Sequence, residues 1–245
     1  MSVSSTSTQN NGTLDDSFEN IAKDIIENNF SNKQLIIGLG SGRAATRIVK
    51  LIPPEVAKNC EFICTSLQIK IEAERKNLKI IDESQIPHID IVIDGADQIN
   101  DQFFLIKGGG GALLREKIVY FSAKKTIIVA DFTKFVSTFS RSVPVEILPF
   151  SRTSVLPFIE KLGGTPVLRT LDKGYPYVTE NGNLILDVMF KDYANIPWIE
   201  MELKKLPGIL ETGLFIQAPD ICYCALNDNQ YKKYEPTSKN NNIIK

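Results

Sequence analysis

The stretch of sequence that decides the fold is LIIGLGSGRAATRIVKL, at residues 35–51. Its first three residues are bulky and apolar, which is typical of a short buried strand. Glycines follow at positions 38, 40 and 42, and glycine is the residue that tight turns favour. Residues 43–51 then continue with the spacing of a helix. A strand that passes through a glycine turn into a helix predicts an α/β protein.

Short strands separated by helices continue along the first half of the chain. We expect further strands at residues 62–64, 89–93, 103–106 and 126–130, and helices at residues 67–76 and 112–123. This alternation predicts an α/β fold built on a doubly wound, mostly parallel sheet of the Rossmann-like type.

The pattern changes after Pro144. An Asn-Gly pair at residues 181–182 is a strong turn signal, and it predicts a hairpin between residues 177–179 and 184–190. The other elements expected here are strands at 145–148 and 209–216 and helices at 153–162 and 198–206. Together they predict a smaller α+β domain of the ferredoxin-like type, inserted before a last strand at residues 221–225.

These patterns divide the chain into two domains and two tails. The Rossmann-like domain spans residues 15–142 together with 219–227, and the small α+β domain spans residues 143–218. Residues 1–14 and 228–245 are rich in polar residues, so we expect disordered tails there.

Composition narrows the classes of function. The formal net charge of −1 gives no basic surface for nucleic acid. No apolar run reaches the ~18 residues that a membrane span needs, and the polar N-terminal residues lack the apolar core of a signal peptide. We therefore expect a cytoplasmic protein that binds neither nucleic acid nor membrane. The four cysteines lack C-x-x-C spacing and the chain has a single histidine, so no metal site is predicted.

Ligands of open α/β sheets bind beyond the carboxyl ends of the strands. The first of these ends is the loop at residues 38–43, whose glycines allow close approach of a ligand and whose helix start favours an anion. The loop lacks the Gly-Lys-Ser/Thr ending of a P-loop, and its glycine spacing is not that of a dinucleotide site. It therefore indicates either an anion site without a nucleotide cofactor or a plain strand–helix turn.

The other strand ends carry acids, glycines and lysines. Asp94 and Asp97 follow one strand, and buried acids are costly unless they are paired. Lys107 begins the run KGGGG, whose entropic cost a ligand lying against the loop would explain. Glu116 falls in the first turns of the next helix; taken alone, it reads as a solvated acid favoured there by the helix dipole. Lys134 adds a cation at the same edge.

Assembled at one edge of the sheet, these side chains suit proton transfer next to a carbonyl group. A carboxylate with a raised pKa can act as the base, and a cation can stabilise the enediolate oxygen that forms. This chemistry requires no metal ion and no organic cofactor.

Several segments also resemble the signature blocks of a known family. The blocks are DGAD at 94–97, KGGGGALLREK at 107–117 and PVEI at 144–147. Later blocks agree in order, namely LGG at 162–164, TENGNLILD at 179–187 and PGILETGLF at 207–215. From about residue 20 to 226 the chain is similar to type A ribose 5-phosphate isomerases.

The resemblance implies the interconversion of ribose 5-phosphate and ribulose 5-phosphate in the pentose phosphate pathway, without a cofactor. By matching position, Glu116 resembles the general base, and Lys107 would stabilise the enediolate. Asp94 and Asp97 would handle hydroxyl protons and ring opening. The family is dimeric or tetrameric, so we expect a homodimer or a homotetramer.

The resemblance also implies which residues bind the sugar phosphate. The loop at 41–44 and Lys134 would hold the phosphate and nearby hydroxyls, and the backbone of the other two strand ends would line the sugar. The expected substrate-binding residues are Ser41, Gly42, Arg43, Ala44, Gly95, Ala96, Gly108, Gly109, Gly110 and Lys134.

The chain departs from the family pattern in its first loop. The family commonly has Gly-Thr-Gly-Ser-Thr there, and this chain has Arg43 and Ala44 in place of the last two hydroxyl residues. We expect Arg43 to pair with the substrate phosphate, because a guanidinium can donate two parallel hydrogen bonds. The alternative is that it points into solvent, as most arginines do. Asn20 and Gln98 stand where lysine and glutamate are usual.

Two alternatives of other classes stay open. The altered loop would suit a catalytically silent sugar-phosphate-binding protein on the same scaffold, which binds its ligand without turnover. The other alternative is an amino-sugar phosphate deaminase or a CoA transferase, whose patterns residues 107–117 fit poorly.

Overall fold

The large domain is built on a six-stranded sheet. The structure, a computed structural model, describes residues 13–30, 34–82 and 88–236. In spatial order the strands are β13 (Tyr231–Tyr234), β12 (Ile221–Ala225), β6 (Ala123–Asp131), β3 (Ile89–Asp94), β1 (Leu35–Leu39) and β2 (Cys60–Cys64). The strands from β12 to β2 run parallel, and β13 is antiparallel to β12. The predicted mostly parallel sheet is confirmed.

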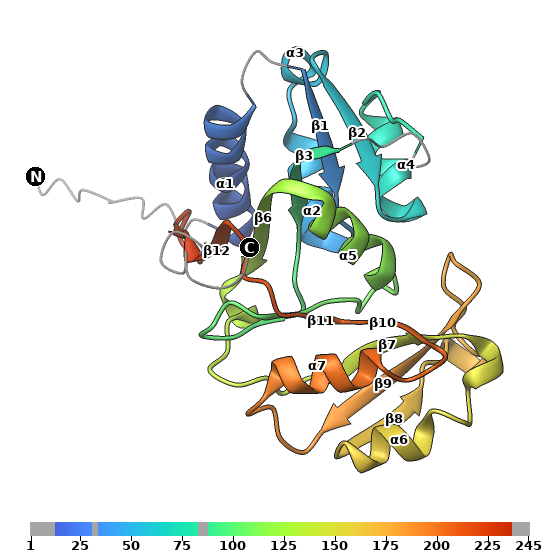
Figure 1. Cartoon of the computed structure of the whole chain (residues 1–245). Coiled ribbons are helices and arrows are strands. Elements are labelled where there is room, and N and C mark those ends of the chain that lie inside the picture. Colours follow the sequence, from blue (N-terminus) through green and yellow to red (C-terminus); the bar gives the residue numbers. More distant parts are fainter. Residues whose placement is uncertain (1–12, 31–33, 83–87, 237–245) are drawn as a thin grey trace, which may run out of the picture.

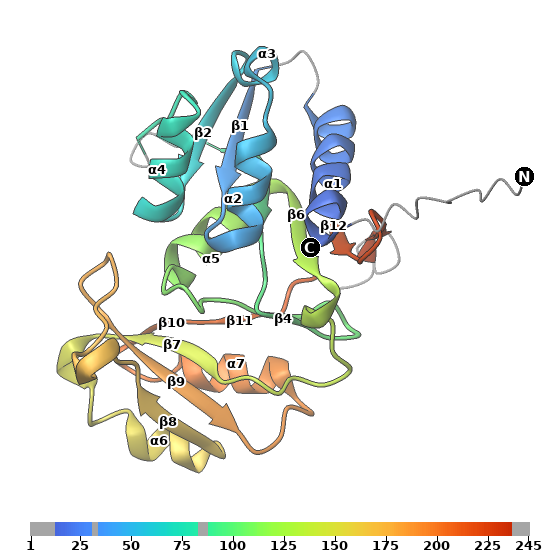
Figure 2. The ribbon, with the colours of Figure 1, turned by 180° about the vertical axis from the view of Figure 1, so that it is seen from behind.

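Helices cover both faces of this sheet, as the front and back views show (Figures 1 and 2). Along β6, Ile127 and Val129 pack toward α1, α2 and α4, whereas Ile128 and Ala130 pack toward α5. This alternation follows from the two-residue period of a strand, and it makes the sheet doubly wound, as predicted. The helices are α1 (Leu14–Asn29), α2 (Gly42–Leu51), α3 (Pro54–Ala57), α4 (Leu67–Arg75) and α5 (Leu113–Ser122).

The helix α1 is absent from the elements expected from the sequence. It begins with a capping box, in which Asp16 N donates to Thr13 Oγ1 at 3.3 Å and Thr13 N donates to Asp16 Oδ2 at 2.6 Å. One side of the helix is apolar and packs into the core of the large domain through Phe18, Ile21, Ala22 and Ile25. The predicted tail therefore ends before Thr13, and its residues 1–12 lie outside the described residues.

The small domain has the order strand, helix, strand, strand, helix, strand. Its antiparallel sheet has the spatial order β10-β7-β9-β8, with α6 and α7 packed against it. This arrangement is the predicted ferredoxin-like one. The segment at 177–179 forms only an isolated bridge and no strand, because Val178 pairs with Leu184 alone. The elements are β7 (Val143–Ile147), α6 (Leu156–Lys161), β8 (Gly164–Leu168), β9 (Leu184–Phe190), α7 (Ile196–Lys204) and β10 (Ile209–Thr212).

A third sheet joins the two domains. It has the order β11-β5-β4 and is antiparallel, with β4 at Gln98–Ile99, β5 at Leu105–Ile106 and β11 at Leu214–Phe215. The strand predicted at 103–106 therefore does not belong to the parallel sheet, because β5 pairs antiparallel with β4 and β11. Short 3-10 helices complete the fold at Phe132–Lys134, Pro149–Ser151 and Asp172–Gly174.

The tail predicted at 228–245 is wrong for its first part. Residues 231–234 form β13, and the ring of Tyr234 lies 5.4 Å from that of Phe103. Residues 237–245 lie outside the described residues, and the domain boundaries at 142/143 and 218/219 stay predictions. No helix in the described part of the chain is long and apolar enough to cross a membrane.

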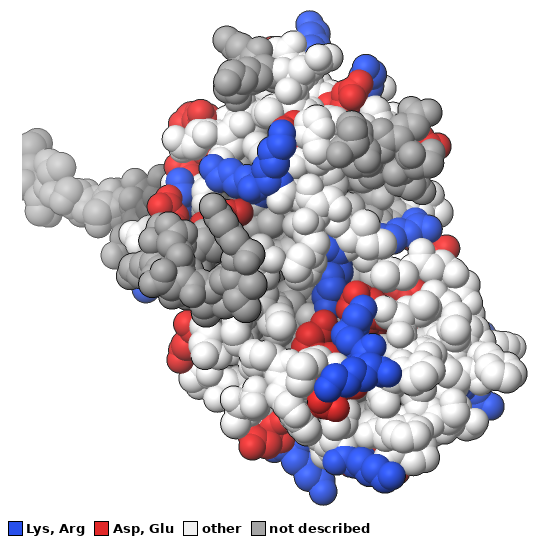
Figure 3. Space-filling view, in the orientation of Figure 1, with Lys and Arg blue, Asp and Glu red and all other residues white. Residues whose placement is uncertain are grey.

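A buried lysine links the two domains. Lys117 Nζ of α5 lies 2.9 Å from Glu200 Oε1 on α7 and 2.9 Å from Glu211 Oε1 on β10, and it donates to Leu214 O at 2.8 Å. The side chain is only 8% exposed, so these partners offset the cost of burying its charge. On the face drawn in Figure 3, basic and acidic side chains gather where the two domains meet.

We predict that Lys117→Met destabilises the protein by ~3–5 kcal/mol, because it leaves Glu200 and Glu211 half-buried without this cation. The measurement is the free energy of unfolding from urea denaturation followed by circular dichroism. The matched control is Lys205→Met, which breaks an exposed pair with Glu202 at the C-terminal end of α7 and should cost ~0–1 kcal/mol. Equal losses for the two variants would contradict the prediction.

Candidate active site

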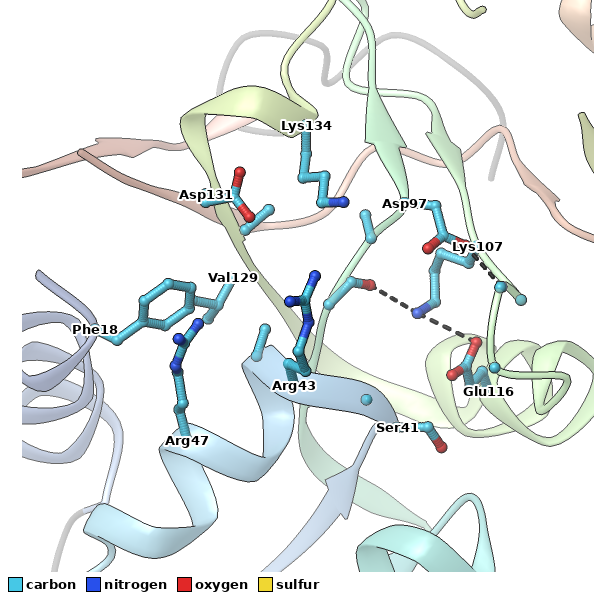
Figure 4. A pocket seen from close by; sticks show the side chains of 18 of the residues that line it. Phe18, Ser41, Arg43, Arg47, Asp97, Lys107, Glu116, Val129, Asp131 and Lys134 are labelled. Carbon is cyan, nitrogen blue, oxygen red and sulfur yellow. Dashed lines mark hydrogen bonds and ion pairs between the residues drawn. The ribbon is translucent and has the colours of Figure 1, made fainter. Parts of the chain in front are cut away.

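A cavity of about 210 Å³ opens at the carboxyl ends of β1, β3 and β6. Strand ends, the glycine loop, the start of α2 and one side of α1 form its wall (Figure 4). Polar side chains stand at both ends of it. The lining residues are Leu14, Phe18, Ser41, Gly42, Arg43, Ala44, Arg47, Gly95, Ala96, Asp97, Lys107, Gly108, Gly109, Gly110, Glu116, Val129, Ala130, Asp131 and Lys134.

One end of the cavity is closed by a buried ion cluster. Lys107 Nζ lies 2.8 Å from Asp94 Oδ2 and 3.3 Å from Glu116 Oε2, and it donates to Gly95 O at 2.7 Å. The Lys107 side chain is 3% exposed and that of Asp94 is fully buried. Gly40 makes room for this acid, because a Cβ at residue 40 would lie 1.8 Å from Asp94 Oδ1.

The cluster shifts the pKa of each member. Burial raises the pKa of Glu116 to about 7, and the negative charge of Asp94 adds to that rise while Lys107 opposes it. Burial also raises the pKa of Asp94 against the attraction of Lys107. Burial would lower the pKa of Lys107, but the two carboxylates outweigh it and keep that pKa above its usual value. Lys107 therefore stays charged, and Glu116 titrates near neutral pH.

The glycine loop follows Lys107 and crosses the cavity wall. Gly109 N donates to Asp97 Oδ2 at 2.7 Å, which ties the loop to the end of β3. Gly109 and Gly110 are exposed, whereas Gly108 is buried. The backbone of the loop tip and the carboxylate of Asp97 therefore face the same space as Lys107.

The other end of the cavity is cationic. The helix α2 starts there with Ser41 at its N-cap, and the Ser41 side chain does not cap it. Instead Ser41 Oγ bonds to Thr65 Oγ1 at 2.9 Å and to Ser66 Oγ at 2.7 Å, away from the cavity. Gly42 N donates to Gln68 Oε1 at 3.1 Å, which leaves the N–H groups of Arg43 and Ala44 without a side-chain acceptor in the described part of the chain. Arg43 points into the cavity, on the side where Lys134 stands (Figure 4). Two free N–H groups at a helix start, beside two cations, are suited to a phosphate group.

The structure brings together nearly every residue predicted for the site. All of them line the cavity except Asp94, which lies behind Lys107. The prediction missed Arg47, whose Nη2 lies 2.6 Å from Asp15 Oδ1 and whose Cζ lies 4.6 Å from the Phe18 ring centre. Its spacing of four residues from Arg43 was the available signal, because such residues share one face of a helix. Within the described ranges, no group of three or more His, Cys, Asp or Glu is arranged to hold a metal ion.

The cavity has a buried carboxylate and an ammonium group at one end and free N–H groups with two cations at the other. These groups suit the chemistry of an aldose–ketose isomerase. Comparison with known sequences identifies one family within this class. The sequence model of the family described as ribose 5-phosphate isomerase A (phosphoriboisomerase A) matches residues 61–229. The chain belongs to this family.

Curated relatives match along most of the chain. The ribose-5-phosphate isomerase of Dictyostelium discoideum is 39% identical over 204 residues, which cover 80% of this chain and 88% of the relative. Ribose-5-phosphate isomerase A of Methanosarcina acetivorans is 35% identical over 213 residues, covering 85% and 91%.

Solved structures share the fold. A D-ribose-5-phosphate isomerase in complex with phospho-erythronic acid superposes with a TM-score of 0.82 at 29% identity, covering 91% of this chain and 97% of that one. Ribose 5-phosphate isomerase A of Methanocaldococcus jannaschii gives a TM-score of 0.80 at 28% identity, covering 91% and 100%.

We predict that the Glu116 carboxyl of the free protein titrates with a pKa of about 7, protonated below it and ionised above. The measurement is the carboxyl signal of protein labelled with carbon-13 glutamate, assigned by its loss in Glu116→Gln. Asp94→Asn should lower this pKa, because it removes a like charge beside Glu116. A pKa that stays at the ordinary 4.5 would contradict the prediction.

Proposed function

We propose that the chain interconverts ribose 5-phosphate and ribulose 5-phosphate, a step of the pentose phosphate pathway, by moving a proton between C1 and C2. The observation that carries the proposal is the contact of Glu116 with Lys107, 3.3 Å apart at the closed end of the cavity. The phosphate would then lie at the cationic end, near Arg43 and Lys134. Phospho-erythronic acid, which a related structure holds, carries a carboxylate at one end and a phosphate at the other. The enediolate of the sugar phosphate would have negative charge at the same two ends.

The proton transfer starts from the open-chain sugar. The Glu116 carboxylate removes the proton from C2 of the aldose, the C–H electron pair becomes the C1=C2 double bond, and the carbonyl pair moves to O1. The Lys107 ammonium stabilises the enediolate that results. Glu116 then returns the proton to C1, while the hydroxyl proton on O2 passes to O1 and the C2 carbonyl forms. A base with a pKa of about 7 can both take and return the proton at neutral pH.

The two aspartates have different parts in this mechanism. Asp97 lines the cavity beside the glycine loop, so it is the acid that can handle hydroxyl protons and ring opening. Asp94 is fully buried behind Lys107, and the earlier expectation that it takes substrate protons itself is revised. Its part is to hold the ammonium in place and to raise the pKa of Glu116.

The phosphate end uses backbone and side chains together. The N–H groups of Arg43 and Ala44 start α2 without a side-chain cap, and the guanidinium of Arg43 replaces the family's hydroxyls. Lys134 adds a second charge. The backbone of Gly95, Ala96 and the loop Gly108–Gly110 lines the sugar between the two ends. We also infer a cytoplasmic homodimer or homotetramer, as the resemblance implies.

We predict that Glu116→Gln lowers kcat for ribose 5-phosphate ~10²–10⁴-fold, because the amide has nearly the shape of the acid but cannot accept a proton. Steady-state kinetics and binding of phospho-erythronic acid are measured on wild type and variant, and binding should persist. A variant with near-normal kcat would remove Glu116 as the base. A wild-type protein that binds the ligand but has no turnover would instead support the silent sugar-phosphate-binding protein.

We predict that Arg43→Ala raises KM for ribose 5-phosphate by at least ~10-fold, because each hydrogen bond to a charged group contributes ~1.5–3 kcal/mol. The slow turnover of unphosphorylated ribose is measured in parallel and should change little. The control is Arg75→Ala, since Arg75 is exposed and pairs with Glu72 on α4. An equal loss for both sugars, or none for either, would exclude Arg43 from the phosphate site.

A further inference from the structure

The small domain holds the glycine loop from outside the cavity. Arg169, which follows β8, donates from Nη1 to Gly108 O at 2.9 Å and to Gly109 O at 3.2 Å. Asp187 of β9 fixes the same guanidinium, with Nε at 2.9 Å from Oδ2 and Nη2 at 2.5 Å from Oδ1. The Arg169 side chain is 15% exposed. One planar group therefore joins the small domain to two carbonyls of the loop.

Tyr177 holds the next carbonyl of the loop. Its hydroxyl donates to Gly110 O at 3.0 Å, and Arg169 Cζ lies 5.9 Å from the centre of its ring. Gly111 makes this approach possible, because its φ is +86° and a Cβ there would lie 2.2 Å from Tyr177 Oη. Three successive carbonyls are thus held by donors of the small domain.

The direction of each carbonyl fixes the direction of the next N–H, because the two point opposite ways across a trans peptide. The Gly109 N–H, opposite the Gly108 carbonyl, donates to Asp97. The Gly110 N–H, opposite the Gly109 carbonyl, has no acceptor within the part of the chain that the structure describes. Gly110 lines the cavity, so this N–H is available to a ligand.

We propose that Arg169, held by Asp187, is a positioning residue that keeps the Gly109 carbonyl turned outward and so directs the Gly110 N–H at the oxyanion of the reacting sugar. The inference rests on the proposed isomerase function. Arg169 is not among the residues that line the cavity, and it acts on the reaction only through the loop.

The composition of the loop explains why such a residue is needed. The peptide between Gly109 and Gly110 has no Cβ on either side, so it can turn over at little steric cost. A turned peptide would present its carbonyl oxygen to the developing negative charge, in place of the N–H donor that stabilises this charge. Arg169 opposes that movement directly through its charge-assisted hydrogen bond to Gly109 O. Its bond to Gly108 O and the Tyr177 bond to Gly110 O hold the peptides on either side.

The test is Arg169→Met, which keeps a long side chain and removes every donor. We expect kcat for ribose 5-phosphate to fall ~10²-fold, the usual effect of losing one oxyanion donor. KM should change much less, because the charge that the Gly110 N–H stabilises develops only in the transition state. Tyr177→Phe removes the hydroxyl that holds the neighbouring peptide and should lower kcat ~2- to 10-fold; it carries the test where Arg169→Met does not fold.

The matched control is Lys204→Met. Lys204 also bridges a carbonyl and a carboxylate of the small domain, with Leu210 O at 3.0 Å and Glu211 Oε2 at 2.7 Å, but it does not contact the loop. Its kcat should equal that of the wild type. The same fall in this control, a rise of KM that matches the fall in kcat, or wild-type kcat in Arg169→Met or Tyr177→Phe would overturn the proposal.

A failure of the proposed function gives a different result. A wild-type protein without activity on ribose 5-phosphate overturns the proposed function. Crystal structures of wild type and Arg169→Met then test the inference about Arg169. A turned or disordered Gly109–Gly110 peptide in the variant supports it. An unchanged peptide overturns it.

Discussion

The site depends on one buried ammonium group. Lys107 is 3% exposed, and a cation so far from water needs anionic neighbours to remain charged. Asp94 and Gly95 O hold it from the large domain, and Glu116 shares it at the cavity wall. The same contacts that keep Lys107 charged bring two acids close together, and burial, with the repulsion from Asp94, raises the pKa of Glu116 toward neutrality. The stability of the charge and the basicity of the acid therefore have a common origin.

The small domain contributes to the site without lining it. Lys117, next in sequence to Glu116, is anchored by Glu200 and Glu211, and the glycine loop is anchored by Arg169 and Tyr177 through its carbonyls. The helix that carries the base and the loop that faces it are thus fixed from the same side. A domain that adds no lining residue to the cavity therefore still fixes the position of residues that do line it.

Much of this could be predicted from the sequence, because polar and glycine residues at the ends of apolar strands point to one edge of a sheet. The helix α1 could also have been found from the capping box of Thr13 and Asp16 and from the spacing of Phe18 and Ile25. Other features depend on tertiary contacts that no local pattern encodes. The YKKY segment of β13 has no alternation and becomes a strand only by pairing with β12. The burial of Asp94 behind Lys107 arises only when two separate sheets meet.

The position of β12 has a consequence for synthesis of the chain on the ribosome. This strand follows the whole small domain in sequence, yet it lies between β6 and β13 in the sheet. The first helix depends on the same late segment, since Ser17 Oγ donates to Leu226 O and Asn20 Nδ2 donates to Asn229 O at 2.9 Å. A nascent chain can therefore pack α1 against α2, but it cannot complete the contacts of α1 until residues 221–229 emerge. The helix that supplies Leu14 and Phe18 to the cavity wall therefore gains its last contacts only after every other lining residue of the cavity has been made.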